Sequence, residues 1–338
     1  MSLGVHTKVQ VWPQMVAEPL PQTRLLVENI LCPVNFSESS LAAFNYGASL
    51  ARRLRSRLFV QHTVQFPSTV GVESQKPEFD GQLLEAIKQR AGIRIRRMAA
   101  VARLQLPEIR LLINDGDIHD RVLQSIAQNN IDLVVMGTPY HENNQDSDWK
   151  SLTERIVYDS RCPVLISRRP QKDFVNPDEL HPAHLRTIVL AMDLSPHPDC
   201  AIVEALKWAA SWSANLIVFH AVQKRSNGSE NGIASPSNCD LSLEGQLTQA
   251  LDQIQKHSPA FASKKIVIGR DVRTGDARKL VLELAEEKNA DLIVMGSRRS
   301  SLIANSWGST ISAVVSDGRF PVLVVPRSAL RPRQSGAQ

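Results

Sequence analysis

The chain has 338 residues, of which 43% are hydrophobic and 22% are charged, so a globular protein of about two domains is expected. No run approaches the roughly 18 apolar residues that a membrane span needs. Because the N-terminus also lacks the basic start and apolar core of a secretory signal, we expect a cytoplasmic protein with no membrane partner.

The formal net charge of +5 raises the question of a polyanionic partner. The arginines at positions 94, 96, 97 and 103 lie in a stretch whose pattern predicts a helix with a solvated face. Nucleic acid is therefore not expected as a partner.

The four cysteines, Cys32, Cys162, Cys200 and Cys239, show no CxxC spacing. This arrangement predicts neither a zinc site nor a disulfide framework, so we expect reduced thiols and no bound metal. Cys32 and Cys162 flank predicted strands and are expected to be buried apolar residues.

Strands and helices alternate along the first half of the chain. After an N-terminal extension at 1–26, the apolar run ENILCPVNF predicts a strand, and Ser37 caps the helix that follows. The later pattern predicts a strand at 57–64, a polar insert at 65–80, a long helix, a strand at 108–114, a helix at 116–128, a strand at 131–137, a helix at 151–160 and a strand at 162–167.

The second half repeats this order. It starts with the strand RTIVLAMDL, after which Ser195 caps a helix with Pro196 in its first turn. The remaining predicted elements are strands at 215–222, 264–272, 291–296 and 321–325 and helices that begin at Leu241, Ala277 and Gly308. The predicted connections are a linker at 169–185, a mobile loop at 224–240 and a basic, disordered tail at 328–338.

The two halves also share sequence. DLVVMG, which ends at Gly137, returns as DLIVMG ending at Gly296, and RCPVLIS from Arg161 returns as RFPVLVV from Arg319. Such a long period exceeds the roughly 20 to 50 residues of solenoid repeats, so each copy is large enough to bury its own core. We therefore expect a tandem duplication, with domains at 27–168 and 186–327.

Nearly continuous apolar strands between helices predict parallel sheets that are covered on both faces. Each copy is thus expected to be a doubly wound α/β domain. In such sheets ligands bind beyond the carboxyl ends of the strands, where the winding direction reverses. If strands one and four are neighbours, Asp193 and Gly296 lie at that point.

The strings IVLAMDLSP, VFHAV, VRTGDA, DLIVMGS and FPVLVV occur in this order and resemble the universal stress protein family. The resemblance covers nearly all of 28–167 and 187–327. It implies five-stranded sheets of order 3-2-1-4-5, of the adenine nucleotide alpha hydrolase-like type, and two domains paired through their last strands. A tandem chain would form that pair as an intrachain pseudo-dimer, and further association into a homodimer stays open.

In one branch of the family, ATP binds at the strand ends through a glycine loop after the fourth strand, with the spacing G, two residues, G, nine residues, G and then Ser or Thr. The second copy resembles part of this loop, because Gly296 is present and Gly308-Ser309-Thr310 opens the last helix. Arg299 stands in place of the second glycine, and the spacing is one residue short. Glycines and a helix N-terminus suit phosphate because backbone amides can approach the anion closely.

The resemblance implies an ATP site, with magnesium only as a companion of the nucleotide. Asp193 matches the acidic residue that faces the nucleoside, Met295 and Ala221 match the adenine pocket, and the arginines at 298 and 299 would contact phosphates. The implied residues are Ala191, Asp193, Ala221, Met295, Gly296, Arg298, Arg299, Gly308, Ser309 and Thr310. Alternatively, Gly308-Ser309-Thr310 is only a helix cap, Asp193 is a turn residue and the arginines belong to a solvated loop.

The first copy departs further from the glycine-loop pattern. Asn35 replaces the aspartate, and Lys150 occupies the position of the glycine that opens the helix. Glu142, Asp146 and Asp148 would repel a triphosphate. We therefore expect a structural or regulatory first domain without a nucleotide.

His62 and His220 recur at matching positions, and we expect both to be hydrogen-bonded structural residues without a chemical role.

Three functions follow from these observations. The leading hypothesis is a non-enzymatic stress-response protein that binds ATP or another adenine nucleotide in its second domain. The alternative is a scaffold with two closed pockets, which Arg299 and Lys150 favour. An enzyme on the same fold is disfavoured, because GxxxxGK[ST], SGGxDS, HIGH and GxSxG motifs are all missing.

Overall fold

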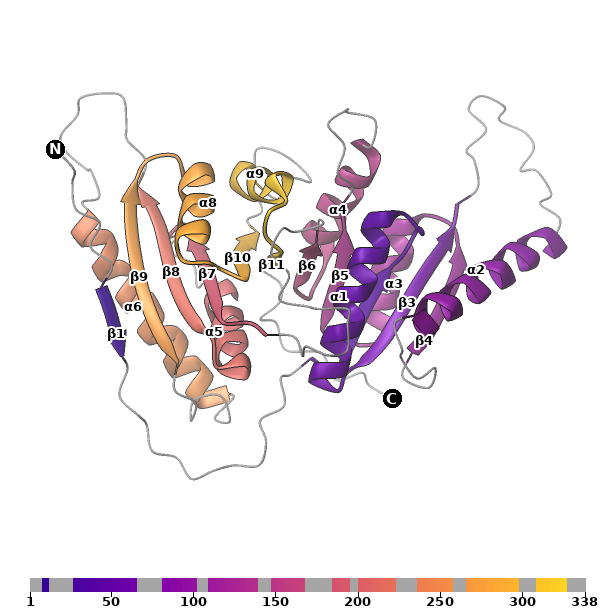
Figure 1. Ribbon diagram of the computed structural model, residues 1–338, viewed down its shortest axis with the longest axis horizontal. Coiled ribbons are helices and arrows are strands. Elements are labelled where there is room, and N and C mark those ends of the chain that lie inside the picture. The colour runs from indigo at the N-terminus through magenta and orange to yellow at the C-terminus, as the bar shows by residue number, and fades with distance from the viewer. Residues whose placement is uncertain are drawn as a thin grey trace.

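The computed structural model describes residues 8–11, 27–65, 81–101, 109–138, 147–167, 184–194, 200–222, 236–257, 266–297 and 308–326. Two α/β halves lie side by side and share one sheet (Figure 1). The first half consists of β2 (Asn29–Pro33), α1 (Glu38–Leu54), β3 (Arg57–Val64), α2 (Gly81–Val101), β4 (Ile109–Asp115), α3 (Ile118–Gln128), β5 (Leu133–Gly137), α4 (Ser147–Asp159) and β6 (Val164–Ser167). The second half consists of β7 (Thr187–Met192), α5 (Cys200–Trp212), β8 (Asn215–Val222), α6 (Pro236–His257), β9 (Val267–Thr274), α8 (Ala277–Glu287), β10 (Leu292–Ser297), α9 (Ser309–Asp317) and β11 (Val322–Pro326).

The strands follow the order β1-β9-β8-β7-β10-β11-β6-β5-β2-β3-β4. Counted from its own first strand, each half has the order 3-2-1-4-5, and all neighbours within a half are parallel. This order agrees with the doubly wound prediction. The halves meet where β6 and β11 pair in antiparallel fashion, with Leu165 opposite Leu323.

A strand at the far edge of the second half was not predicted. β1 (Lys8–Val11) lies within the expected N-terminal extension and pairs antiparallel with β9, so that Val11 is opposite Val267. Four residues give only two alternations of side chains, which is too short a pattern to identify a strand from the sequence.

Hydrophobic cores cover both faces of the sheet, and each core continues through both halves. Helices α1, α2, α5 and α6 pack on one face and contribute Phe44, Ile95, Trp208 and Leu243, among others. Helices α3, α4, α8 and α9 pack on the other face and contribute Val122, Ile156, Leu284 and Ile311. Within the described ranges, no helix combines the length and apolar composition that crossing a bilayer requires.

Two helix starts differ from the predictions. α6 begins at Pro236 and not at Leu241, so the loop predicted at 224–240 is shorter, and its residues up to 235 lie outside the described residues. α4 begins at Ser147 and not at position 151. Proline is tolerated in the first helical turn, and serine and aspartate are favoured there, so these polar starts resemble loop sequence.

All four cysteines are buried free thiols in the structure, and the burial of Cys32 and Cys162 was predicted. Burial raises the pKa of the Cys32 thiol and raises that of Cys162 to about 12. Thiolates, which are the nucleophilic and metal-binding form, are therefore disfavoured at both positions.

The duplication is visible in the backbone. Within the part of the chain that the structure describes, six residues other than glycine have positive φ, and they form three pairs at equivalent positions of the two halves. Phe36 at 64° and Leu194 at 55° both follow the first strand of their half. The pairs are Phe36 with Leu194, Arg55 with Ser213, and Asn130 with Asn289.

The repeated aspartate of DLVVMG and DLIVMG fixes the start of the first strand in each half. Asp132 Oδ2 accepts hydrogen bonds from the amides of Glu28 and Asn29 at 2.8 and 2.9 Å. Asp291 Oδ2 accepts from Arg186 and Thr187 at 2.7 and 3.0 Å. One carboxylate thus joins strands one and four at their amino ends in both halves.

Gly137 marks a close approach in the first half. A Cβ atom at this position would collide with the backbone carbonyl of Ser39, in the first turn of α1. The first turn of α1 therefore lies directly against the last residue of β5, at the carboxyl edge of the sheet.

We predict that replacing Asp291 by alanine lowers the free energy of unfolding by about 2 kcal/mol, because two strand amides lose a charged acceptor. Asp132→Ala should cost a similar amount, since its two hydrogen bonds are equivalent. Urea unfolding followed by circular dichroism measures both, and a large difference between the two variants would contradict the equivalence.

We also predict that Gly137→Ala destabilises the protein by about 1–3 kcal/mol, because backbone atoms must move to admit the methyl group. Gly245→Ala is the matched control, since an added Cβ at this α6 position meets no atom within 4 Å. The control should gain about 0.5–1 kcal/mol from helix propensity. Equal unfolding midpoints for the two variants would contradict the close contact at Gly137.

Candidate nucleotide site

The carboxyl ends of the first and fourth strands are adjacent in the second half. In the β7–β10 pairing, Ala191 is opposite Met295, which confirms the assumption that these strands are neighbours. Asp193 follows β7 directly and is exposed, and Gly296 lies next to Met295 in β10. The point where the winding direction reverses thus carries Ala191, Asp193, Met295 and Gly296 together.

The apolar residues of the predicted site differ in exposure. Met295 is buried, whereas Ala191 and Ala221 are half-buried and pack against the core on the side of α9. Ala221 belongs to β8, the strand that pairs with the other side of β7. The surface beside these strand ends is therefore apolar, as a planar base requires.

The last helix opens on a glycine in an unusual conformation. Gly308 is the N-cap of α9 with φ 98° and supplies no side-chain cap. A Cβ at this position would meet no atom within 4 Å, although its conformation disfavours any other residue. Ser309 is exposed and Thr310 half-buried, and the first-turn amides have no acceptor within the helix.

Several residues of the predicted sites lie outside the part of the chain that the structure describes. Arg298 and Arg299 lie outside the described residues, as do Ser195 and Pro196. The same holds for Glu142 and Asp146 of the first half. The described part of the predicted site therefore comprises the strand ends and the start of α9.

The first half differs at the equivalent edge. Asn35 Oδ1 accepts hydrogen bonds from the amide and hydroxyl of Ser37 at 3.0 and 2.6 Å, so it stabilises the start of α1. The Phe36 ring lies 4.6 Å from that of His62, and the Arg94 guanidinium lies 4.3 Å from the Phe36 ring centre. Phe36 packs on the core that α1 and α2 cover, as Leu194 does in the second half.

The prediction that Lys150 stands where a helix opens is wrong for the first half. α4 starts at Ser147, so Lys150 lies within the helix. Asp148 also belongs to α4. No glycine opens this helix in the way that Gly308 opens α9.

The recurring histidines have the structural role that was predicted. His62 Nδ1 donates to the carbonyl oxygen of Val34 at 2.8 Å, and His220 Nδ1 donates to that of Met192 at 2.9 Å. Each bond ties the second strand to the residue that ends or follows the first strand. The same contact in both halves argues against a role in one site only.

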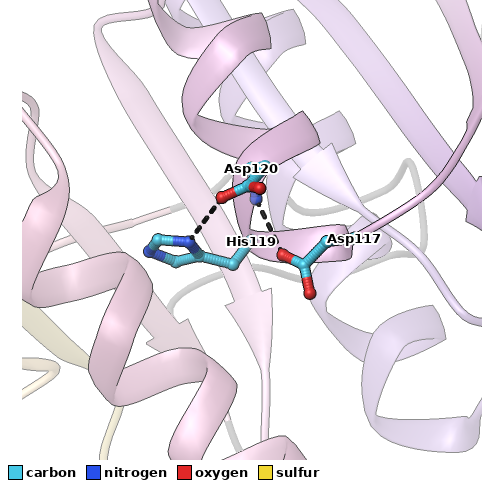
Figure 2. Close-up of side chains that lie close together, drawn as sticks. All are labelled: Asp117, His119 and Asp120. Atoms are coloured by element: carbon cyan, nitrogen blue, oxygen red, sulfur yellow. Dashed lines mark hydrogen bonds and ion pairs between the residues drawn. The ribbon is translucent and has the colours of Figure 1, made fainter.

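A cluster that the sequence did not suggest lies at the start of α3, where Asp117, His119 and Asp120 come together (Figure 2). Asp117 caps the helix by accepting from the Asp120 amide at 3.1 Å, and His119 Nδ1 lies 3.2 Å from Asp120 Oδ1. His119 Nε2 lies 2.9 Å from Asp159 Oδ2 of α4. A helix cap and a link between α3 and α4 account for these groups.

The sequence also did not reveal a charged network between β9 and α8 that is centred on the buried Asp271. Asp271 is 1% exposed and binds the Arg273 guanidinium through both oxygens at 2.9 and 3.0 Å. Arg273 also contacts Glu287 of α8 at 2.6 Å, and these partners raise the pKa of the arginine. The network holds β9 to α8 and is structural.

A sequence model of a protein family, described as the universal stress protein family, matches residues 27–168 and 184–326. Universal stress protein A homolog 1 of Coxiella burnetii is 30% identical over 144 residues, which are 42% of this chain and 96% of that protein. Universal stress protein A homolog 2 of the same organism is 30% identical over 142 residues, which are 41% of this chain and 94% of that protein.

Among solved structures, a universal stress protein from Archaeoglobus fulgidus shares the fold with a TM-score of 0.61 and 19% identity, covering 88% of this chain and 96% of its own. The family model matches both halves and together most of the chain. This protein therefore belongs to the universal stress protein family and carries two family domains in tandem.

Proposed function

We propose that this protein is a non-enzymatic stress-response protein that binds an adenine nucleotide, ATP with its magnesium, in the domain at 186–327. The domain at 27–168 supports that state and binds no nucleotide. The observation that carries the proposal is Gly308, which opens α9 with a positive φ at the edge where β7 and β10 end.

The geometry at Gly308 suits a phosphate group. A residue at φ 98° without a side chain leaves its backbone accessible to a ligand. The amides at the start of α9 and the positive end of the helix dipole favour an anion. Ser309 and Thr310 would add hydroxyl donors, and Arg298 and Arg299 would neutralise charge by hydrogen bonds.

The strand ends supply the rest of the proposed site. Asp193 is exposed beyond β7, where its carboxylate would accept hydrogen bonds from ribose hydroxyls. Ala191, Ala221 and Met295 would border the base, with Gly296 leaving room beside it. Base recognition would then depend largely on backbone groups.

Differences between the halves support a single nucleotide. At the equivalent edge of the first half, Asn35 stands in place of Asp193, and its side-chain oxygen accepts hydrogen bonds from Ser37. α4 has no glycine at its start.

We further propose that the β6–β11 pairing makes the chain a pseudo-dimer, the one-chain counterpart of the domain pair that the family resemblance implies. Its antiparallel register and continuous cores support this assignment. A cytoplasmic location would suit an ATP-binding role. The alternative function, a scaffold without nucleotide, is favoured by Arg299 in place of a loop glycine.

The first test is denaturing extraction of purified protein with mass spectrometry, followed by calorimetric titration with magnesium and ATP. We predict that the parent binds ATP and that Gly308→Trp weakens binding at least about 100-fold, because the indole occupies the space for phosphate. Lys150→Trp, at the equivalent position of the first half, is the matched control and should bind like the parent. Folded parent protein without affinity for ATP would instead support the scaffold.

We predict no catalytic turnover of the bound nucleotide, because no nucleophile or phosphate-activating motif accompanies the site. The measurement is phosphate and ADP release over hours with parent and Gly308→Trp protein. Steady release by the parent well above the variant would show an enzyme and refute this part of the proposal.

A further inference from the structure

The outer helices of the two halves, α2 and α6, carry exposed apolar side chains. Among the described residues, the large apolar side chains with high exposure are Leu83 at 50%, Ile93 at 48% and Leu241 at 67%. Leu83 and Ile93 belong to α2, and Leu241 belongs to α6. These helices are equivalent, since each follows the second strand of its half, and they lie at opposite ends of the molecule (Figure 1).

The exposed face of α2 is strongly cationic. Arg90, Arg94, Arg96 and Arg97 are all exposed, and none of them has an acidic partner among the described residues. The Arg94 guanidinium lies over Phe36, and the one carboxylate of the helix, Glu85, pairs with Lys88 at 3.4 Å. Arginines next to apolar side chains are typical of protein interfaces.

The equivalent helix carries the opposite charge. The sequence of α6 contains three carboxylates, Asp240, Glu244 and Asp252, and no arginine, with Lys256 as its one lysine. Asp252 is exposed, and Glu244 keeps a side-chain exposure of 38% although it pairs with Arg270. Leu241 lies on this helix, so an apolar side chain again accompanies the charges.

We propose that two copies of this chain associate through these helices, with α2 of each copy on α6 of the other. Both helices pack on the same core, so they lie on the same side of the sheet. A twofold axis across the long axis of the molecule would exchange the two ends and form both contacts at once. The arrangement of α2 on α2 would instead bring arginines of like charge together.

Both contacts are needed for a closed assembly. α2 has 21 residues and is about 30 Å long, so one helix pair buries less than the roughly 800 Å² per partner of a standard interface. A single contact would leave a free end on each copy and build open chains. Two reciprocal contacts close the dimer and make it salt-sensitive, because charge pairs contribute.

The test is the mass of the full chain by sedimentation equilibrium up to several hundred micromolar, at low and high ionic strength. The parent should form a dimer that high salt weakens. Arg90→Glu should weaken the dimer about 10-fold, since it replaces an attraction by a repulsion. Lys279→Glu, the same charge change on the exposed face of α8, is the control and should leave dimerisation unchanged.

A charge-swap experiment separates this contact from other modes of association. One variant carries Arg90→Glu with Arg97→Glu, and the other carries Thr248→Lys with Asp252→Lys. Each variant should be a monomer alone, and an equimolar mixture should dimerise, because both helix pairs are then complementary again. Folding of each is checked by thermal unfolding.

Three results would overturn the proposal. They are a parent that stays monomeric throughout, a dimer that neither variant weakens, and a monomer that uses the α2 arginines to bind vesicles of phosphatidylserine. The last result would assign α2 to a membrane surface. Dimerisation is independent of nucleotide binding, so Gly308→Trp should not affect it.

Discussion

The pairing of β6 with β11 is the contact on which the rest of the structure depends. β6 is the edge strand of the first half and β11 is the edge strand of the second half. Leu165 and Leu323 are fully buried where these two strands meet. Alone, either half would present unpaired backbone groups on a buried apolar strand, which favours aggregation. The antiparallel pairing satisfies these groups and lets both cores continue across the junction. The Arg53 guanidinium of α1, 5.2 Å from the ring centre of Trp212 of α5, adds a polar contact between the halves.

The two halves share the contacts that folding requires, whereas the residues beyond their strand ends differ. Asp132 and Asp291 bind equivalent strand amides in their own halves, and His62 and His220 each bind a carbonyl oxygen at the equivalent position. In contrast, Asn35 stands opposite Asp193 in the repeat, and a lysine stands opposite Gly308. Because the shared core needs both halves, the contacts that build it recur, whereas residues beyond the strand ends are not needed by the core and were free to diverge.

The alternation of buried strands with amphipathic helices allowed the doubly wound fold to be predicted. That the first and fourth strands are neighbours was an assumption, which the pairing of Ala191 with Met295 confirms. Helix starts at Ser147 and Pro236 could not be predicted, since polar first turns resemble loops. The Asp271–Arg273 pair was missed because charged residues in a strand normally indicate an exposed face. The His119 contact with Asp159 joins residues that are far apart in sequence, so no local pattern reveals it.

The outer helices show the same division between core and surface. α2 buries Ile95 and Ala99, and α6 buries Leu243 and Leu247 on the same side of the sheet. Exposed substitutions usually change stability by less than about 0.5 kcal/mol, so folding does not determine the charge of the outward faces. Stability alone therefore gives no reason for several exposed arginines on one helix and carboxylates on its counterpart. Opposite charges at the two ends of one chain are what self-association with exchanged ends requires, since identical charges would repel in that arrangement.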